Sequence, residues 1–316
     1  MSCIRYSKFN ITIQFTRNAA IPAFKCSTLR GGLGDVLLEE HCIAGGNCRN
    51  CSFRESCVVP GIYYHPLKIV PPSVNDGGSL GYTFECLDRR TYVNAGDQLE
   101  FSLLLYGDVI VYFSVILDAL YRLGMAGIGQ RKQGKFQIVQ ICTQDRSLIF
   151  GNGTVNPRAV TVRDLMQDAD RMRNKCGIQE AADSYDVRIR FLTPWTQKWR
   201  NDFLENFQME AFLTSVHRRV YLLHCMEGID FPEILDMDLS DVSLETLEIH
   251  RADESRYSNT HGSKIRLHGI EGEFVLHHVP GKLFPYIFAG AIAHIGKNTS
   301  IGFGQYEVNA VTESRI

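Results

Sequence analysis

The sequence lacks the basic excess that marks many nucleic-acid-binding proteins. Its 316 residues include 33 lysines and arginines against 35 aspartates and glutamates, a formal net charge of −2. This balance excludes a global positive field, so any RNA site must be a local group of cations. With 45% hydrophobic and 22% charged residues, the composition is that of a globular protein and excludes a disordered chain. The length suits two domains.

Long hydrophobic runs are also missing. The longest apolar run, Val109–Leu120, is interrupted by Tyr112, Ser114 and Asp118, and it is shorter than the roughly 18 residues that a membrane span needs. The N-terminus, MSCIRYSKFN, has no secretory hydrophobic segment. We therefore expect a cytoplasmic protein with no membrane partner.

The order of expected elements repeats in the two halves of the chain. The first half predicts a strand at Phe9–Thr16, a helix in TLRGGLGDVLLEEHC, a strand at Gln98–Tyr106, a helix at Val109–Gly124 and a strand at Lys135–Ile141. The second half predicts a strand at Asp186–Phe191, a helix at Gln208–Met226, a strand at Gly272–Val279, a helix at Lys282–Ala293 and a strand from Gln305. Each half therefore follows one plan.

Strand, helix, two strands, helix and strand is the order of the ferredoxin-like fold, a split βαβ unit whose antiparallel sheet carries both helices on one face. We predict an α+β protein of two tandem ferredoxin-like, RRM-like domains. Residues 1–145 form the first, with a cysteine-rich insertion at 42–57. Residues 146–183 form an irregular linker, and residues 184–316 form the second domain.

A glycine-rich loop precedes the last strand of each predicted domain. The first loop, AGIGQRKQGK, contains Arg131, Lys132 and Lys135; the second, IGKNTSIGFG, contains Gly296, Lys297, Gly302 and Gly304. Glycines let backbone N–H groups approach a phosphate, and the cations would neutralise it. The same glycines could instead only permit a tight turn. Neither loop has the Walker spacing, and their equivalent positions favour RNA binding over a nucleotide site.

Two further basic segments are weaker candidates. HGSKIRLHG, which includes Lys264, and the triplet 217–219 could line an RNA track. Solvated faces of a strand and a helix explain them equally well.

Four of the ten cysteines lie within sixteen residues, as Cys42, Cys48, Cys51 and Cys57. The spacing, with a central CxxC, suits a tetrahedral zinc ion and less often an iron–sulfur cluster. Reduced structural cysteines are the remaining alternative. Four protein ligands would leave no open position, so the expected zinc is structural and we expect no catalytic metal.

Several motifs together resemble the repeat-associated (RAMP) superfamily of CRISPR proteins, and most of all its Cas-six endoribonucleases. They are HIGKNTSIGFGQYEV near the C-terminus, RYS at 256–258, GIEGEF at 269–274, and LRGGLG at 29–34 followed by the cysteines. The resemblance implies that the chain binds CRISPR repeat RNA and cuts the precursor once per repeat without a required metal. It implies 2′,3′-cyclic phosphate and 5′-hydroxyl ends, with the mature crRNA retained or passed to an effector complex.

Attack by a ribose 2′-hydroxyl needs a base, an acid for the leaving oxygen, and cations around the phosphorane. The resemblance places the catalytic histidine near the end of the first helix, which is His41. This histidine could instead only meet the helix dipole or contribute to the metal site. His65 is the second candidate base. The expected supporting groups are Tyr63 or Tyr64 for proton transfer, and Arg30 or Lys68 for the phosphate charge.

Two other functions share these features. A non-catalytic RAMP subunit would hold guide RNA in an effector complex with the same fold and loops. A metal-stabilised binding module unrelated to CRISPR would share only the cysteines. Cleavage of repeat RNA distinguishes the endoribonuclease from the non-catalytic subunit, and a lack of RNA binding would favour the unrelated binding module.

Overall fold

The computed structural model describes residues 3–72, 74, 80–179, 184–234, 238–258 and 263–313, with the side chains of Arg49 and of residues 253–258, 263–266 and 310–313 left aside. The chain forms two compact units. Arg5–Arg163 make up the N-terminal unit, and Met1–Ile4 with Asp164–Ile316 make up the C-terminal unit.

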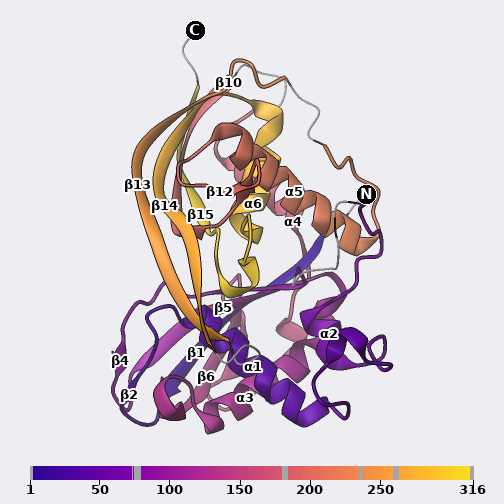
Figure 1. Cartoon of the computed structure of the whole chain (residues 1–316), viewed down its shortest axis with the longest axis vertical. Helices are drawn as coiled ribbons and strands as arrows, with labels where there is room; N and C mark the ends of the chain where they lie inside the picture. The colour runs from indigo at the N-terminus through magenta and orange to yellow at the C-terminus, as the bar shows by residue number, and fades with distance from the viewer. Residues whose placement is uncertain are drawn as a thin grey trace. The chain divides into compact units, whose positions relative to one another are not determined.

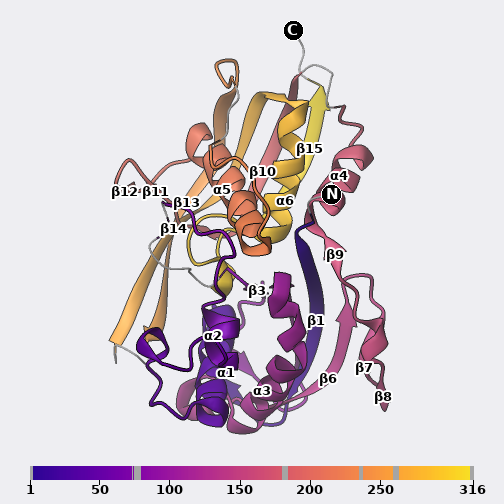
Figure 2. The same cartoon turned by 90° about the vertical axis from the view of Figure 1, so that its right-hand side faces the viewer.

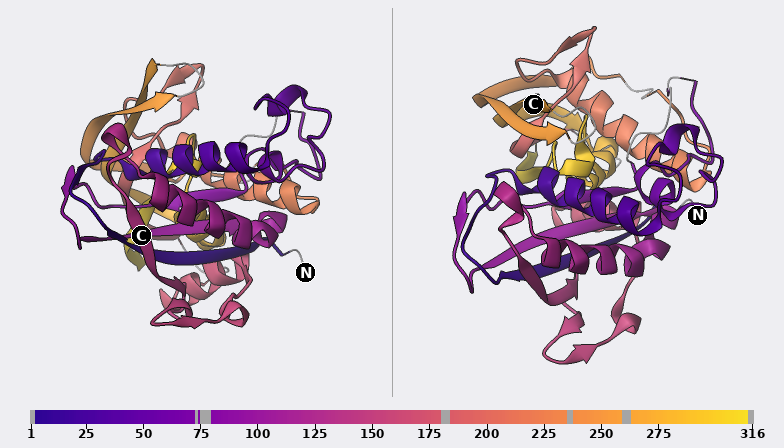
Figure 3. Two further views of the ribbon diagram at one scale, coloured as in Figure 1. Left: turned by 90° about the horizontal axis from the view of Figure 1, so that it is seen from below. Right: turned by 60° about the horizontal axis from the view of Figure 1, so that its bottom comes forward.

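The N-terminal unit is an antiparallel sheet covered by helices. Its sheet has the order β3-β5-β1-β6-β7-β8, formed by β1 (Arg5–Phe15), β3 (Tyr82–Glu85), β5 (Gln98–Tyr106), β6 (Phe136–Thr143), β7 (Leu148–Gly151) and β8 (Thr154–Val155). Every second residue of β1 from Phe9 to Phe15 is buried, as the strand period requires. Figure 3 shows α1 (Lys25–His41) and α3 (Phe113–Ala126) side by side on one face of this sheet.

Glycines explain how α1 packs although glycine weakens helices. A Cβ at Gly32 would lie 2.6 Å from Leu123 of α3, and one at Gly34 would lie 3.1 Å from the Tyr63 hydroxyl of α2 (Val58–Tyr63). The missing side chains therefore allow both neighbouring helices to approach. The helix predicted at this segment is confirmed, and its glycines lie at contacts.

The C-terminal unit has the same construction. Its sheet has the order β13-β14-β10-β15, formed by β10 (Ser184–Trp195), β13 (Ser243–Ser258), β14 (Ser263–Pro280) and β15 (Tyr306–Glu313). In Figure 1, β13 and β14 run as a long curved pair. Figure 2 shows α5 (Met209–Glu227) and α6 (Phe284–Ala293) together against the sheet. Between them Phe191 packs with Phe212, Phe274 and Tyr306.

The two units share one strand order. Each unit has four main strands, which in chain order are β1, β3, β5 and β6 in the first unit and β10, β13, β14 and β15 in the second. In both sheets these four strands lie side by side in the order second, third, first, fourth. All these pairs are antiparallel. The predicted α+β fold of two tandem ferredoxin-like domains is confirmed.

Regular structure fills much of the segment expected to be a linker. β7 pairs with β6 and extends the first sheet, while α4 (Leu165–Lys175) packs on α6 of the C-terminal unit. Asp164 caps α4 by accepting an N–H bond from Met166 at 2.9 Å. Both elements form because they bury apolar residues, Ile149 in β7 and Leu165 in α4. The boundary between the units lies at residues 163 and 164.

The remaining elements are short. They are β2 (Ala19–Ala20), β4 (Tyr92–Val93), β9 (Arg163–Asp164), β11 (Lys198–Trp199), β12 (Asp202–Phe203) and the 3₁₀ turns η1 (Cys48–Asn50), η2 (Gly107–Tyr112), η3 (Gln130–Lys132), η4 (Pro157–Ala159), η5 (Gly281–Leu283) and η6 (Thr299–Ile301).

One helical stretch among the described residues, Gly107–Ala126, is long and apolar enough to cross a membrane by length and composition. A buried core helix passes the same test, so a single such stretch is weak evidence. Ile116, Leu120 and Leu123 of α3 are buried inside the N-terminal unit. The expectation of no membrane partner stays a prediction.

Candidate RNA-binding loops and catalytic residues

The two glycine-rich loops have the same backbone design. The helix before each loop ends at a residue with positive φ, Gly127 (φ 91°, ψ 156°) in one and His294 (φ 61°, ψ 158°) in the other. The next residue, an isoleucine in both loops, donates its N–H to the carbonyl of a glycine, Gly134 at 3.0 Å and Gly304 at 3.1 Å. The loops are thus equivalent in structure as well as in sequence position.

A second glycine brings each loop against the segment that follows the first strand of its unit. A Cβ at Gly129 (φ 76°) would meet the carbonyl oxygen of Ala20, and one at Gly296 (φ 80°) would meet that of Thr196. Both positions combine positive φ with close backbone contact, so glycine is required twice over.

The N–H groups of Gly134, Gly302 and Gly304 are occupied by the protein itself. Gly302 donates to the Thr299 carbonyl at 2.8 Å, and Gly304 donates to the Pro194 carbonyl at 2.9 Å. In the first loop, Gly134 donates to Ile128 at 2.9 Å. These glycines therefore shape the turns, which the sequence left open as an alternative. These three N–H groups are not free to bind a phosphate, so the loop cations are the main source of attraction for it.

The cations of both loops are at least partly exposed to solvent. Arg131, Lys132 and Lys297 are exposed and Lys135 is half-buried. Within the described part of the chain, none of the four has an ion pair. The side chain of Lys264 lies outside the described residues. Each unit therefore presents unpaired positive charge beside its glycine-rich loop.

Arg30 and Tyr63 form a packed cluster inside the N-terminal unit. The Tyr63 hydroxyl donates to the Arg30 carbonyl at 2.6 Å, and Arg30 Nε donates to the Tyr82 hydroxyl at 3.0 Å. The guanidinium lies 4.9 Å from the centre of the Tyr63 ring. Burial raises the pKa of Tyr63 well above its ordinary value. This arrangement favours a structural role for Tyr63 over proton transfer.

His41 lies elsewhere on the same helix. It is the exposed last residue of α1, eleven residues after Arg30. At 1.5 Å per residue this is about 16 Å along the helix axis. Tyr64 is half-buried at the end of α2, where its backbone N–H donates to the Pro60 carbonyl. The structure therefore does not bring His41, Arg30 and Tyr63 into one cluster.

His65 has a defined orientation. Its Nδ1 lies 3.0 Å from the Gly61 carbonyl oxygen, which can only accept, so Nδ1 carries the proton and Nε2 is left able to accept one. Three residues further along, Lys68 pairs with Asp108 at 2.9 Å, and Arg5 pairs with the same carboxyl at 2.6 Å. The two cations hold the pKa of Asp108 below its ordinary value. Sequence reasoning missed Arg5 and Asp108, because only the fold brings them to Lys68.

The cysteine segment connects α1 to α2. Cys42 follows the last turn of α1, and Cys57 precedes α2. A cavity of about 340 Å³ is lined by Cys42, Cys51 and Cys57 together with His41 and apolar residues. Burial raises the pKa of the Cys48 thiol, and the other three cysteines raise it further. All four predicted ligands therefore lie within electrostatic reach of one another.

This segment does not have the geometry of a formed metal site. In the part of the chain that the structure describes, no group of three or more His, Cys, Asp or Glu side chains is arranged to hold a metal ion. The donors nevertheless suit zinc, since all four thiols are free and the Gly46 N–H donates to Cys42 Sγ at 3.2 Å. The zinc site stays a prediction.

Two family models match the chain, one in each unit. Residues 189–306 match the CRISPR-associated endoribonuclease Cas6, and residues 4–163 match a model described as an N-terminal domain. The C-terminal unit therefore matches the Cas6 endoribonuclease family. This is the family whose resemblance the motifs indicated. No curated protein matches the sequence.

Solved structures share the fold over nearly the whole chain. A partial Cas6-RT-Cas1–Cas2 complex has a TM-score of 0.54 and 11% identity, and the match covers 98% of this chain and 46% of that chain. A Cas6 product complex has a TM-score of 0.53 and 13% identity, and Thermus thermophilus Cas6 has a TM-score of 0.51 and 12% identity. Each of these matches covers 98% of this chain and 100% of the other chain. The chain thus spans about half the length of the first relative. At these identities the likeness shows the fold alone.

Proposed function

We propose that this chain binds the repeats of a CRISPR precursor RNA and cuts once within each repeat. The reaction is attack of a ribose 2′-hydroxyl on the adjacent phosphate without a catalytic metal, leaving 2′,3′-cyclic phosphate and 5′-hydroxyl ends. The observation that carries this proposal is the family match over residues 189–306, because that segment contains the loop of Gly296 to Gly304 with its unpaired Lys297. RNA would be held there by charge.

The chemistry belongs to the N-terminal unit. We propose His41 as the base that takes the 2′-hydroxyl proton, supported by its exposure and by the family resemblance. Tyr64 is the more accessible of the two tyrosines as the acid. Lys68 would offset phosphate charge. His65 is the rival base, supported by its fixed tautomer and by the neighbouring cations.

Cleavage of a labelled repeat RNA in EDTA, followed on a denaturing gel, tests the proposal. The wild type should cut once per repeat. His41→Ala should cut about 10²–10⁴-fold more slowly while binding RNA as before. The control is His250→Ala, which changes an exposed histidine of β13. Full activity in His41→Ala with loss in His65→Ala would move the base to His65.

The second candidate function is a non-catalytic subunit that holds guide RNA in an effector complex. It is favoured by the separation of His41 from Arg30 and Tyr63. Tight repeat binding without any cleavage by the wild type would establish it. In either case the partners are CRISPR repeat RNA or crRNA and other CRISPR proteins, in the cytoplasm and without a membrane.

We further propose that Cys42, Cys48, Cys51 and Cys57 hold a structural zinc ion, with an iron–sulfur cluster as the alternative. Its support is that three of these free thiols line one cavity and that the fourth, Cys48, lies within electrostatic reach of them. The metal would fix the connection between α1 and α2, next to His41.

A further inference from the structure

A small hairpin lies beside the second glycine-rich loop. β11 and β12 pair as Lys198 with Phe203 and Trp199 with Asp202. In Figure 2 the hairpin lies at one side of the C-terminal unit. Its base is closed by the Leu204 N–H, which donates to the Gln197 carbonyl at 3.0 Å.

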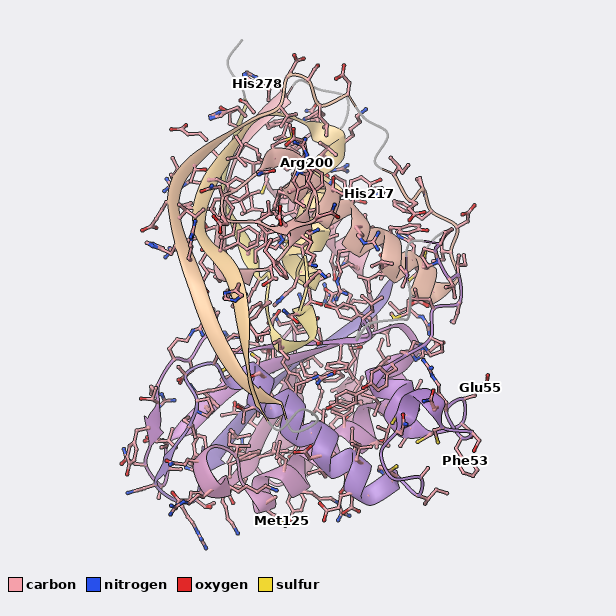
Figure 4. All side chains as sticks on the ribbon, viewed as in Figure 1. Phe53, Glu55, Met125, Arg200, His217 and His278 are labelled. Atoms are coloured by element: carbon pink, nitrogen blue, oxygen red, sulfur yellow. The ribbon has the colours of Figure 1, made fainter. Side chains whose placement is uncertain are left out.

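The turn of this hairpin presents an arginine in an unusual conformation. Arg200 and Asn201 have φ of 50° and 75°, the two positive values of a type I′ turn. Asparagine and glycine are the residues that usually occupy such turns, and a long cationic side chain at the first position is uncommon. Arg200 is exposed at the tip and is labelled in Figure 4. Backbone strain of this kind supports a functional role for the side chain.

One face of the hairpin combines an open aromatic ring with a cation. Phe203 is 47% exposed, and Lys198 Nζ lies 5.2 Å from the centre of its ring. Cross-strand partners point to the same face, so Lys198 and Phe203 form one surface. Trp199 is half-buried on the opposite face.

A backbone hydrogen bond connects the glycine-rich loop to the segment just before the hairpin. Lys297 donates its N–H to the Thr196 carbonyl at 2.7 Å, and the two residues form a β-bridge. Lys198 follows Thr196 by two residues, about 7 Å further along an extended chain.

Charge on this edge is mostly positive. Among the described residues, no carboxylate pairs with Lys297, Lys198 or Arg200. Of the nearby acidic groups, Glu205 pairs with Arg251 at 2.7 Å, and Asp202 belongs to the opposite face.

We propose that the hairpin Lys198–Phe203 binds an unpaired nucleotide of the RNA, with a base stacked on Phe203 and phosphates held by Lys198 and Arg200. Aromatic rings flanked by cations suit single-stranded RNA, since every base has a face that can stack and every linkage carries a charge. The inference rests on the proposed function, and it names the form of RNA beside the glycine-rich loop. A duplex would not offer a free base to the ring.

The stacking part is tested with the full-length protein and a labelled 12-nucleotide oligoadenylate containing one 2-aminopurine. The wild type should bind it and quench the 2-aminopurine fluorescence. Phe203→Ala should bind about 5–30-fold more weakly and lose the quenching, whereas Phe203→Tyr should restore both. Tyr121→Ala, which removes a 55% exposed ring from α3, is the matched control and should behave as the wild type.

The charge part is tested by the salt dependence of the same binding. Lys198→Gln/Arg200→Gln should reduce the slope of log affinity against log salt by about 1.4, since each contact with a single strand contributes about 0.7. Affinity at 0.1 M salt should fall by about 25-fold. The control pair Arg158→Gln/Lys175→Gln removes two exposed cations from elsewhere and should leave the slope unchanged.

Each result decides between distinct conclusions. Unchanged binding and quenching in Phe203→Ala would overturn the inference, while cleavage of repeat RNA by the wild type would leave the proposed function standing. A wild type that binds neither oligoadenylate nor repeat RNA would overturn both. Tighter binding of a 12-base-pair RNA duplex than of oligoadenylate would also overturn the inference. Circular dichroism of each variant separates loss of the contact from loss of the fold, and Phe203→Tyr keeps the test informative if the alanine variant unfolds.

Discussion

At Gly296 the second glycine-rich loop has no room for a side chain. A Cβ there would lie 2.8 Å from the Trp195 indole nitrogen and 2.6 Å from the Thr196 carbonyl oxygen, at a φ of 80°. Gly296→Ala should therefore destabilise the C-terminal unit by about 2–4 kcal/mol, from backbone strain and a steric clash together. Urea unfolding followed by tryptophan fluorescence measures this unit alone, because both tryptophans, Trp195 and Trp199, belong to it.

A substitution at Gly177 separates the effect of backbone strain from that of the steric clash. Gly177 has a φ of 73°, but a Cβ there would meet nothing within 4 Å. Gly177→Ala should thus cost only the strain, about 1–2 kcal/mol. If both variants lost the same free energy of unfolding, the close contact between Gly296 and the segment 195–196 would contribute nothing to the cost of Gly296→Ala.

His277 gives the C-terminal unit a pH-dependent contact. Its Nδ1 lies 3.0 Å from Asp186 of β10 and its Nε2 lies 3.4 Å from Glu245 of β13. The hydrogen bond to Asp186 is the main reason that the pKa of His277 is raised. Because the folded pKa exceeds the unfolded value of about 6.5, the stabilisation is complete below that pH and is lost as the pH rises through the folded pKa.

We expect His277→Gln to lower the urea midpoint more at pH 6 than at pH 8. The tryptophan signal reports this comparison directly. A midpoint difference that is the same at both pH values would mean that the histidine contributes packing but no charge.

Among the elements, those with a clear period could be predicted and those without one could not. The alternation of β1 and the apolar spacing of α5 identify both from sequence. All four residues of β3 are buried, so no alternation marks it, and β13 is rich in charged residues that conceal a strand. The residues 165–175 look polar, and only the fold shows that α4 buries its few apolar residues on α6.

The candidate site divides in the same way. Glycines and cations close together in sequence predicted both loops. The partners of Arg30 and Lys68 come from other elements: Tyr82 is 52 residues from Arg30, and Asp108 lies in η2. No local pattern encodes such contacts. Gly127 and His294 occupy equivalent positions at the end of a helix because both have a positive φ. Their residue types differ, so the sequence does not show this equivalence.

The segment of four cysteines between α1 and α2 leads to a prediction about metal content and stability. Purified protein should contain about one zinc per chain, and Cys48→Ser/Cys51→Ser should lose it. Metal that binds only the folded state at 100 to 1,000 times its Kd contributes about 3–4 kcal/mol, so the variant should melt about 6–16 °C lower. Metal analysis and circular dichroism melting check the two parts.

Cys176→Ser is the matched control, because Cys176 is an exposed thiol of the C-terminal unit. It should keep the zinc and the melting temperature. Bound iron with visible absorbance would identify an iron–sulfur cluster instead. Wild-type protein without metal, prepared in zinc-supplemented medium, would leave the cysteines with a structural role only.

At the scale of the whole molecule, a net charge of −2 means that RNA is not attracted from a distance by the protein as a whole. Binding must come from the few unpaired cations at the loops, and it should weaken steeply with salt. The proposed base His41 and the proposed RNA contact Lys297 belong to different units. The proposal therefore assigns proton transfer to one ferredoxin-like unit and phosphate binding to the other.

This division predicts how the two functions combine. Lys297→Gln should raise KM about five-fold at 0.1 M salt and leave kcat unchanged, since one lost contact changes the salt slope by about 0.7. His41→Ala should lower kcat and leave binding unchanged. The described contacts of Lys297 all lie in its own unit, with no partner shared with His41, so the losses in kcat/KM should multiply in the double variant. Single-turnover cleavage with the four proteins measures this, and a double variant no worse than His41→Ala would show that Lys297 acts on the chemical step itself.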